Sequence, residues 1–244
     1  MALLCALQCS LTVSAAGFAE QGVETTADKT AAQVVLLTAH VPPYVAPLGN
    51  GVELVSDKIE GPLVDAVVDY LEGRSVSYDL VMLPWSAAYR RALATPNALV
   101  FPLDRTLSRE DDFHWIKHLQ TNEYFIYGVS PSAQFGTTIS DIVDENGQVS
   151  CTLNSIQCEL LVEMGLPEEN ILRLEGASIP DRYRLLVRNR NQYSIFDPIV
   201  LSFLLKKHRL DGEKLIKLIK AGERESYLAA SINTSPEMIE ALNK

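Results

Sequence analysis

Residues 83–115 read LPWSAAYRRALATPNALVFPLDRTLSREDDFHW, a pattern typical of a helix, then a buried strand, then a turn that carries an arginine. The apolar run ALVF predicts a strand of a parallel sheet, and Arg109 lies in the turn just beyond it. A guanidinium at the mouth of such a strand can bind a carboxylate, because its paired N–H donors match the two carboxylate oxygens. Arg109 is therefore the first candidate binding residue.

The same alternation of strand and helix extends over most of the chain. Apolar, β-branched runs predict strands at 33–40, 75–83, 98–101, 124–129, 149–153, 171–174 and 193–196, and at the start of 227–244. Helical spacing and start signals predict helices at 61–71, 86–94, 155–164, 181–187 and 198–207, and one begun by Ser235 and Pro236. This order predicts an α/β protein with two lobes, each a mostly parallel sheet flanked by helices.

The predicted lobes are not continuous in sequence. The strand and helix within 227–244 are too short to form a domain, so they are expected to complete the first lobe. We therefore predict that lobe 1 comprises residues 31–121 plus 231–244, and that lobe 2 comprises residues 122–230.

Composition limits the kind of partner. The 244 residues are 47% hydrophobic and 21% charged, enough to bury a sizeable core. The net charge of −10 disfavours nucleic acid and anionic lipid, since both are bound through clusters of lysine and arginine.

The first 19 residues carry no charge and end in Gly17-Phe18-Ala19, a small-x-small pattern that signal peptidase prefers. We expect residues 1–19 to be a secretory signal peptide and the mature protein to be periplasmic. A short membrane anchor is the alternative, although the apolar run is shorter than the roughly 20 residues that span a bilayer.

Two cysteines remain after such a leader. Cys151 and Cys158 are close in sequence, and in an exported chain they are a disulfide candidate, with two buried free thiols as the alternative. No metal site is expected, because two sulfurs do not complete a tetrahedral shell. His114 and His118 lie in a segment that looks extended, where this spacing separates the rings.

Several motifs, in order, resemble a known family. VPPY (41–44), a helix led by Gly61-Pro62, LPW (83–85), TLSREDDF (106–113) and SIFDP (194–198) are similar to periplasmic type II solute-binding proteins of the family serving polar amino-acid ABC transporters, extracellular solute-binding protein family 3. The resemblance covers about residues 34–243. It implies a monomer without a cofactor that captures a small polar solute in an interlobe cleft for a membrane transporter permease or a sensor.

The resemblance also implies binding residues on the first lobe. Tyr44 would stack over the ligand, Trp85 would line the pocket, and Arg109 in the T-x-x-R turn would hold the ligand α-carboxylate. Where the family commonly presents small hydroxyl residues before this turn, the chain has Pro102, Asp104 and Arg105, and we include Asp104 among the candidate binding residues.

On the second lobe the resemblance implies that Asp197 accepts the ligand ammonium, with further contacts from Thr152, Asn154 and Ser155. A cation on one lobe and an anion on the other would pair with both charges of a zwitterion as the lobes close. The ligand class that follows is an amino acid or a related carboxylate.

Each assignment has an alternative. Arg109 stands beside Glu110, Asp111 and Asp112 and could form a surface ion pair, while Asp197 could simply cap the helix that starts at Pro198. Tyr44 could be an ordinary packing residue in the turn after Pro42-Pro43, and Trp85 could belong to the core. A second class of function is a cleft enzyme, such as a lyase on the same scaffold, with Glu60 or Asp104 as general base. The chain has no G-x-S-x-G elbow, no phosphate loop and no H-E-x-x-H motif.

Overall fold

The structure is a computed structural model that describes residues 33–48, 54–55, 58–130, 133–188 and 192–244, all within the unit Ala31–Lys244. The predicted signal peptide, residues 1–19, lies outside the described residues. The strands are β1 (Gln33–Thr38), β2 (Ala46–Pro47), β3 (Leu54–Val55), β4 (Ile59–Glu60), β5 (Ser77–Met82), β6 (Ala98–Asp104), β7 (Phe113–Val129), β8 (Val149–Thr152), β9 (Ile171–Leu174), β10 (Tyr193–Phe196) and β11 (Leu215–Ser231). The α-helices are α1 (Pro62–Glu72), α2 (Trp85–Ala94), α3 (Ile139–Asp144), α4 (Ile156–Glu163), α5 (Ile179–Val187), α6 (Pro198–Lys207) and α7 (Pro236–Asn243). Among these residues, no helix combines the length and apolarity needed to cross a bilayer.

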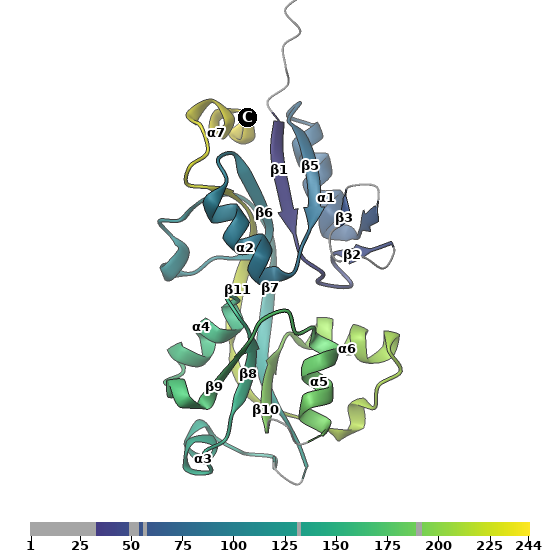
Figure 1. The fold of residues 1–244 in the computed structure, drawn as a ribbon, viewed down its shortest axis with the longest axis vertical. Coiled ribbons are helices and arrows are strands. Elements are labelled where there is room, and N and C mark those ends of the chain that lie inside the picture. The colour runs from purple at the N-terminus through teal and green to yellow at the C-terminus, as the bar shows by residue number, and fades with distance from the viewer. Residues whose placement is uncertain (1–32, 49–53, 56–57, 131–132, 189–191) are drawn as a thin grey trace, which may run out of the picture. The chain divides into compact units, whose positions relative to one another are not determined.

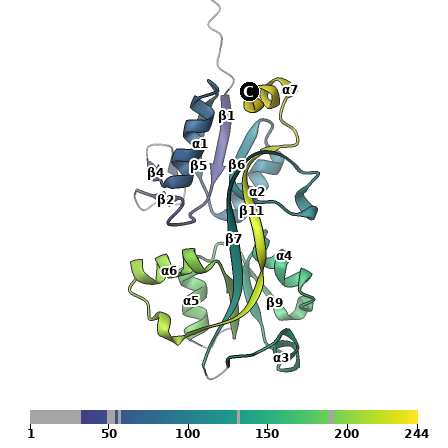
Figure 2. The same ribbon diagram turned by 180° about the vertical axis from the view of Figure 1, so that it is seen from behind.

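Nine strands form one sheet in the order β3-β5-β1-β6-β11-β7-β10-β8-β9. The inner strands β5, β1 and β6 are parallel, and so are β10, β8 and β9. Between the two groups run β7 and β11, two 17-residue strands that pair antiparallel along their length (Figures 1 and 2). The two lobes are therefore joined by a pair of continuous strands.

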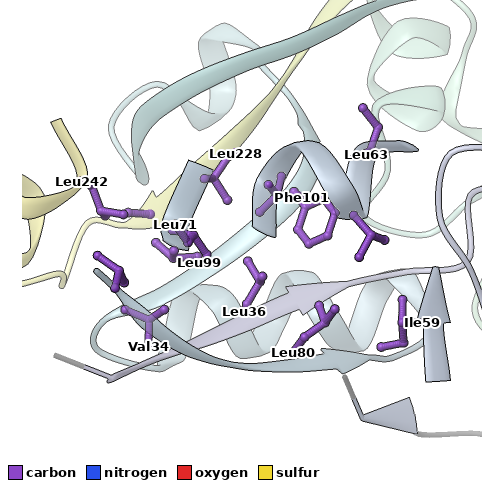
Figure 3. Packing of buried hydrophobic residues seen from close by; sticks show 14 of the residues in the cluster. Val34, Leu36, Ile59, Leu63, Leu71, Leu80, Leu99, Phe101, Leu228 and Leu242 are labelled. Carbon is purple, nitrogen blue, oxygen red and sulfur yellow. The ribbon is translucent and has the colours of Figure 1, made fainter. Parts of the chain in front are cut away.

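Helices cover both faces of the sheet in the first lobe. Leu36 of β1 lies in a core cluster with residues of α1, whereas its neighbour Leu37 lies in another cluster with Ala88 of α2. Successive side chains of a strand point to opposite faces, so an unbroken apolar strand such as β1 needs a helix on each side. Figure 3 shows the α1 side, where Leu36 and Phe101 are among the labelled side chains.

The second lobe follows the same rule. Ile195 of β10 belongs to a cluster that includes residues of α4, and the next residue, Phe196, packs with Leu201 of α6. The α/β fold class predicted from the alternation of strands and helices is thus confirmed by the observed layers.

Local sequence signals explain where the helices begin. Ser235 caps α7, with Pro236 as its first residue, and the Ser235 hydroxyl accepts a hydrogen bond from the amide of Met238 at 3.3 Å. Thr138 and Ser178 form capping boxes at the starts of α3 and α5. These contacts use amides that would otherwise lack partners in the first helical turn.

The long strands differ from the prediction. Residues 113–119 were expected to be extended and 124–129 to be a strand, and the structure joins them into β7. The first part of β11 was missed, because the apolar residues of LIKLIKAGERES are interrupted by lysines and followed by charged residues, and its hydrogen bonds come from pairing with β7. The prediction placed residues 122–230 in the second lobe, yet Leu228 and Ala230 pack in the same cluster as Leu36.

Candidate functional site

The candidate site is a cavity of about 480 Å³ that residues of both lobes line. Its walls include the chain just after β1, β5, β8, β9 and β10, as shown by His40, Trp85, Ser155, Ser178 and Asp197. In α/β sheets the loops beyond the carboxyl ends of parallel strands form the usual ligand site. The topology therefore brings the strand ends of both lobes to one cavity.

A buried acid lies on the first-lobe side of the cavity. Asp104, at the end of β6, accepts hydrogen bonds from the Ser226 hydroxyl at 2.6 Å, the Asn122 amide at 3.1 Å and the Tyr124 hydroxyl at 2.9 Å. Burial raises the pKa of the Asp104 carboxyl, and these three hydrogen bonds oppose that rise. Asp104 lies on β6 and its donors lie on β7 and β11, so it ties these three strands together as well as facing the cavity.

A second acid, Asp197, faces the same cavity from the other lobe. Its Oδ1 accepts the backbone amides of Ile199 at 2.7 Å and Val200 at 3.0 Å, so it caps α6, as the alternative reading of the sequence anticipated. Burial is the largest cause that raises the pKa of Asp197, and the charges of Asp104 and Glu123 add to the rise. Asp197 can cap the helix and also line the cavity, because within the described residues both capping hydrogen bonds use Oδ1 and leave Oδ2 for another contact.

Arg109, the predicted carboxylate ligand in the T-x-x-R turn, contacts other parts of the protein. The residue is 1% exposed, does not line the cavity, and forms an ion pair with Glu159 of α4. The guanidinium also donates to the carbonyls of Asp104 at 3.1 Å and Asn154 at 3.3 Å. Arg109 thus forms an ion pair, but with Glu159 of the second lobe and not with the neighbouring acids Glu110, Asp111 and Asp112. The arginine is buried and the glutamate is 27% exposed.

The other predicted residues divide into two groups. Trp85, Thr152 and Ser155 line the cavity, whereas Tyr44 and Asn154 do not. The indole N–H of Trp85 donates to the carbonyl of Asn154 at 2.8 Å, which links the two lobes at the rim. Tyr44 packs against the α1 cluster, and burial followed by the charge of Asp197 raises its pKa.

Among the cavity residues that were not predicted, two have polar atoms without a hydrogen-bond partner among the described residues. Arg182 of α5 is completely buried, and its Nε and Nη2 have no hydrogen-bond partner among the described residues. Gln157 of α4 is 8% exposed, and its Oε1 is likewise unpaired. A signal for Arg182 existed, because it shares the apolar stripe of α5 with Ile179, Tyr183 and Leu186, where a charged residue is out of place.

Among the described residues, no group of three or more His, Cys, Asp or Glu side chains could hold a metal ion. Glu60, one of the two candidate general bases, is exposed on β4 and does not line the cavity, whereas Asp104 does. Burial lowers the pKa of His40 in the cavity wall, with Lys207 and His208 adding to the effect.

The disulfide between Cys151 and Cys158 is present, with the two Cα atoms 5.4 Å apart. It connects the end of β8 to the first turn of α4 and encloses the loop that carries Thr152 and Ser155. The bridge therefore restrains the polar part of the second-lobe cavity wall.

No protein-family model and no curated protein sequence matches this chain. Solved structures do resemble it. A histidine kinase sensor domain with similarity to periplasmic binding proteins aligns over 87% of each chain, with a TM-score of 0.70 and 15% identity. Holo ArgBP from T. maritima aligns over 86% of this chain and 87% of its own, with a TM-score of 0.65 and 16% identity.

A third similar structure is the amino acid ABC transporter substrate-binding protein AbpA from Streptococcus pneumoniae, bound to L-arginine. It aligns over 86% of this chain and 85% of its own, with a TM-score of 0.63 and 16% identity. At these sequence identities the structural similarity supports the fold alone. The chain has the two-lobed α/β fold of periplasmic-binding-protein-like structures.

Proposed function

We propose that this protein is an extracytoplasmic solute-binding protein that captures a small polar ligand, an amino acid or a related carboxylate, in the interlobe cavity. It would deliver the ligand to an ABC-type transporter or present it to a sensor. The observation that carries this proposal is the cavity of about 480 Å³, lined by both lobes and by the acids Asp104 and Asp197. A volume of this size is within the usual range for small-molecule sites.

The contacts available in the cavity suit a polar molecule with an amino group. Asp197 can accept an ammonium through Oδ2, and Thr152 and Ser155 lie in the same wall. Trp85 supplies a broad apolar surface nearby. The solved structures with this fold include two proteins bound to arginine or named for it, which supports an amino-acid ligand.

A thermal-shift screen of the L-amino acids, acetate, lactate and succinate tests the proposal. A ligand present at about 100 times its Kd stabilises the folded state by about 2.7 kcal/mol, which corresponds to a rise in Tm of roughly 5 to 10 °C for a chain of this size. If no compound in the panel raises Tm, the proposed function is wrong.

The alternative of a cleft enzyme is separated by chemical analysis of the same samples. Asp104 supports this alternative, because a buried acid with a raised pKa that lines a cavity is a typical general base or acid. A binding protein returns the stabilising compound unchanged after hours of incubation. Loss of the compound, abolished in Asp104→Asn, would support the enzyme instead.

Ligand affinity should depend on pH through Asp197. Because its pKa is raised, the Asp197 carboxyl of the empty protein stays protonated at pH values above the ordinary aspartate pKa of 3.8. A bound ammonium would favour the ionised form. Binding would then release a proton, so affinity should rise as pH rises above about the ordinary aspartate value of 3.8, until Asp197 is ionised in the empty protein, by up to roughly tenfold per unit.

Isothermal titration calorimetry at three pH values, in buffers of different ionisation enthalpy, measures both the affinity and the released proton. Asp197→Asn is the control, because Asp104 and His40 also titrate in or near the cavity and would keep their share of the dependence. An affinity that stays constant or falls as pH rises in the parent protein would contradict the assigned role of Asp197.

A further inference from the structure

We propose that Arg182, and not Arg109, is the residue of this chain that binds the carboxylate of the ligand. The inference deepens the proposed function and depends on it, since it concerns the ligand of the same cavity. It places the recognising cation on α5 of the second lobe, whereas the family resemblance implies one in the T-x-x-R turn of the first.

The charge of Arg109 is already neutralised. Its guanidinium pairs with Glu159 and donates to two backbone carbonyls, and its side chain does not line the cavity. To reach a ligand it would have to leave Glu159, whose carboxylate also accepts the Ser108 hydroxyl at 2.7 Å. A ligand carboxylate would therefore replace an equivalent partner and gain little.

Arg182, in contrast, lines the cavity and has no counter-charge among the described residues. Of the described residues that line the cavity, it alone carries a permanent positive charge. Its Nη1 donates to the carbonyls of Ser150 at 3.3 Å and Ile195 at 3.0 Å, while Nε and Nη2 are buried without a partner. No carboxylate of the described chain forms an ion pair with it, and its main further contact is the ring of Phe196, 4.7 Å from Cζ.

A buried cation without a counter-charge is costly, and burial alone lowers the pKa of Arg182 to about 9. The two unpaired nitrogens, Nε and Nη2, are one of the pairs with which a guanidinium holds a carboxylate in two parallel hydrogen bonds. A ligand carboxylate in the cavity would supply the missing anion. The ligand should therefore carry a carboxylate. The hydrogen bonds of Nη1 to the two backbone carbonyls would hold the guanidinium in position to bind it.

The test compares each acid with its own amide. The probes are the L-amino acids, acetate, lactate and succinate, and, for each compound that binds, the corresponding carboxamide. In the parent protein the amide is expected to bind roughly 30-fold or more weakly, because it leaves Arg182 desolvated and unpaired. The acid-to-amide affinity ratio is used because it cancels any general weakening of lobe closure.

The ratio is then measured in three variants. Arg109→Gln should keep the ratio, whereas Arg182→Lys should reduce it severalfold, since lysine cannot form two parallel bonds. Arg184→Gln is the matched control, because Arg184 lies on the same helix but is exposed and pairs with Asp181. It should behave as the parent. If Arg182→Lys does not fold, as judged by circular dichroism, the parent and Arg109→Gln can still overturn the assignment.

The outcomes separate the two proposals. If compounds bind but their amides bind equally well, or if Arg109→Gln abolishes the ratio, the assignment of Arg182 is overturned and the solute-binding function stands. If no acid in the panel binds, both proposals are wrong. A ratio that is retained in Arg109→Gln and Arg184→Gln but falls severalfold in Arg182→Lys supports Arg182, whereas a ratio that Arg182→Lys leaves unchanged overturns the assignment.

Discussion

Replacement of Glu159 by alanine should lower the free energy of unfolding by about 3 kcal/mol, since breaking a buried ion pair leaves an uncompensated charge. The remaining charge is that of Arg109, whose side chain is 2% exposed, whereas Glu159 itself is 27% exposed. The carbonyls of Asp104 and Asn154 would still accept hydrogen bonds from the guanidinium but supply no negative charge. Urea denaturation followed by circular dichroism measures the change.

Glu163→Ala is the matched control for this prediction. Glu163 is the last residue of the same helix α4 and pairs with Arg224, but its side chain is 50% exposed. Exposed ion pairs contribute about 0 to 1 kcal/mol, so Glu163→Ala should have a small effect. If the two variants unfold at the same urea concentration, Arg109 does not depend on Glu159. Such a result would return Arg109 to the set of candidate ligand contacts.

Loss of the disulfide is expected to have the second-largest effect. Cys151 and Cys158 are 7 positions apart in sequence. In the chain-entropy description, closing a loop of this length lowers the entropy of the unfolded chain and thereby stabilises the folded state by about 2 to 3 kcal/mol. The double variant Cys151→Ala/Cys158→Ala should be less stable by that amount. Because the loop carries Thr152 and Ser155, ligand binding should weaken as well.

Reductant provides an independent measurement of the same bond. Dithiothreitol should lower the stability of the parent protein to that of the double alanine variant and should leave the variant unchanged. A parent protein that is equally stable with and without reductant would show that the bridge contributes nothing. If the variant responds to reductant, the effect comes from elsewhere in the chain.

Local sequence signals specified most elements of the fold. Apolar runs such as 33–38 became buried parallel strands, and Ser235 with Pro236 set the start of α7. The order of these elements was enough to predict two α/β lobes, because each apolar strand requires cover on both faces. The first half of β11 escaped prediction, since its structure comes from pairing with β7 and not from its own apolar pattern.

The site was predicted only in part. Five of the eight candidate binding residues line the cavity, namely Trp85, Asp104, Thr152, Ser155 and Asp197. Each lies just after or at the end of a strand, and strand ends can be recognised in sequence because local patterns specify where a strand stops. Position at a strand end is therefore a property that the sequence expresses directly.

What the amino-acid sequence by itself determined is which segments form strands and helices, how the helices are capped, and that two nearby cysteines could be joined. The partner of each charged side chain was decided only by the tertiary structure. Arg109 pairs with Glu159, 50 residues further along the chain, and Arg182, beside the cavity, has no anionic partner within the part of the chain that the structure describes. Electrostatic pairing depends on distance in space and on exclusion from water, and packing of the two lobes sets both quantities.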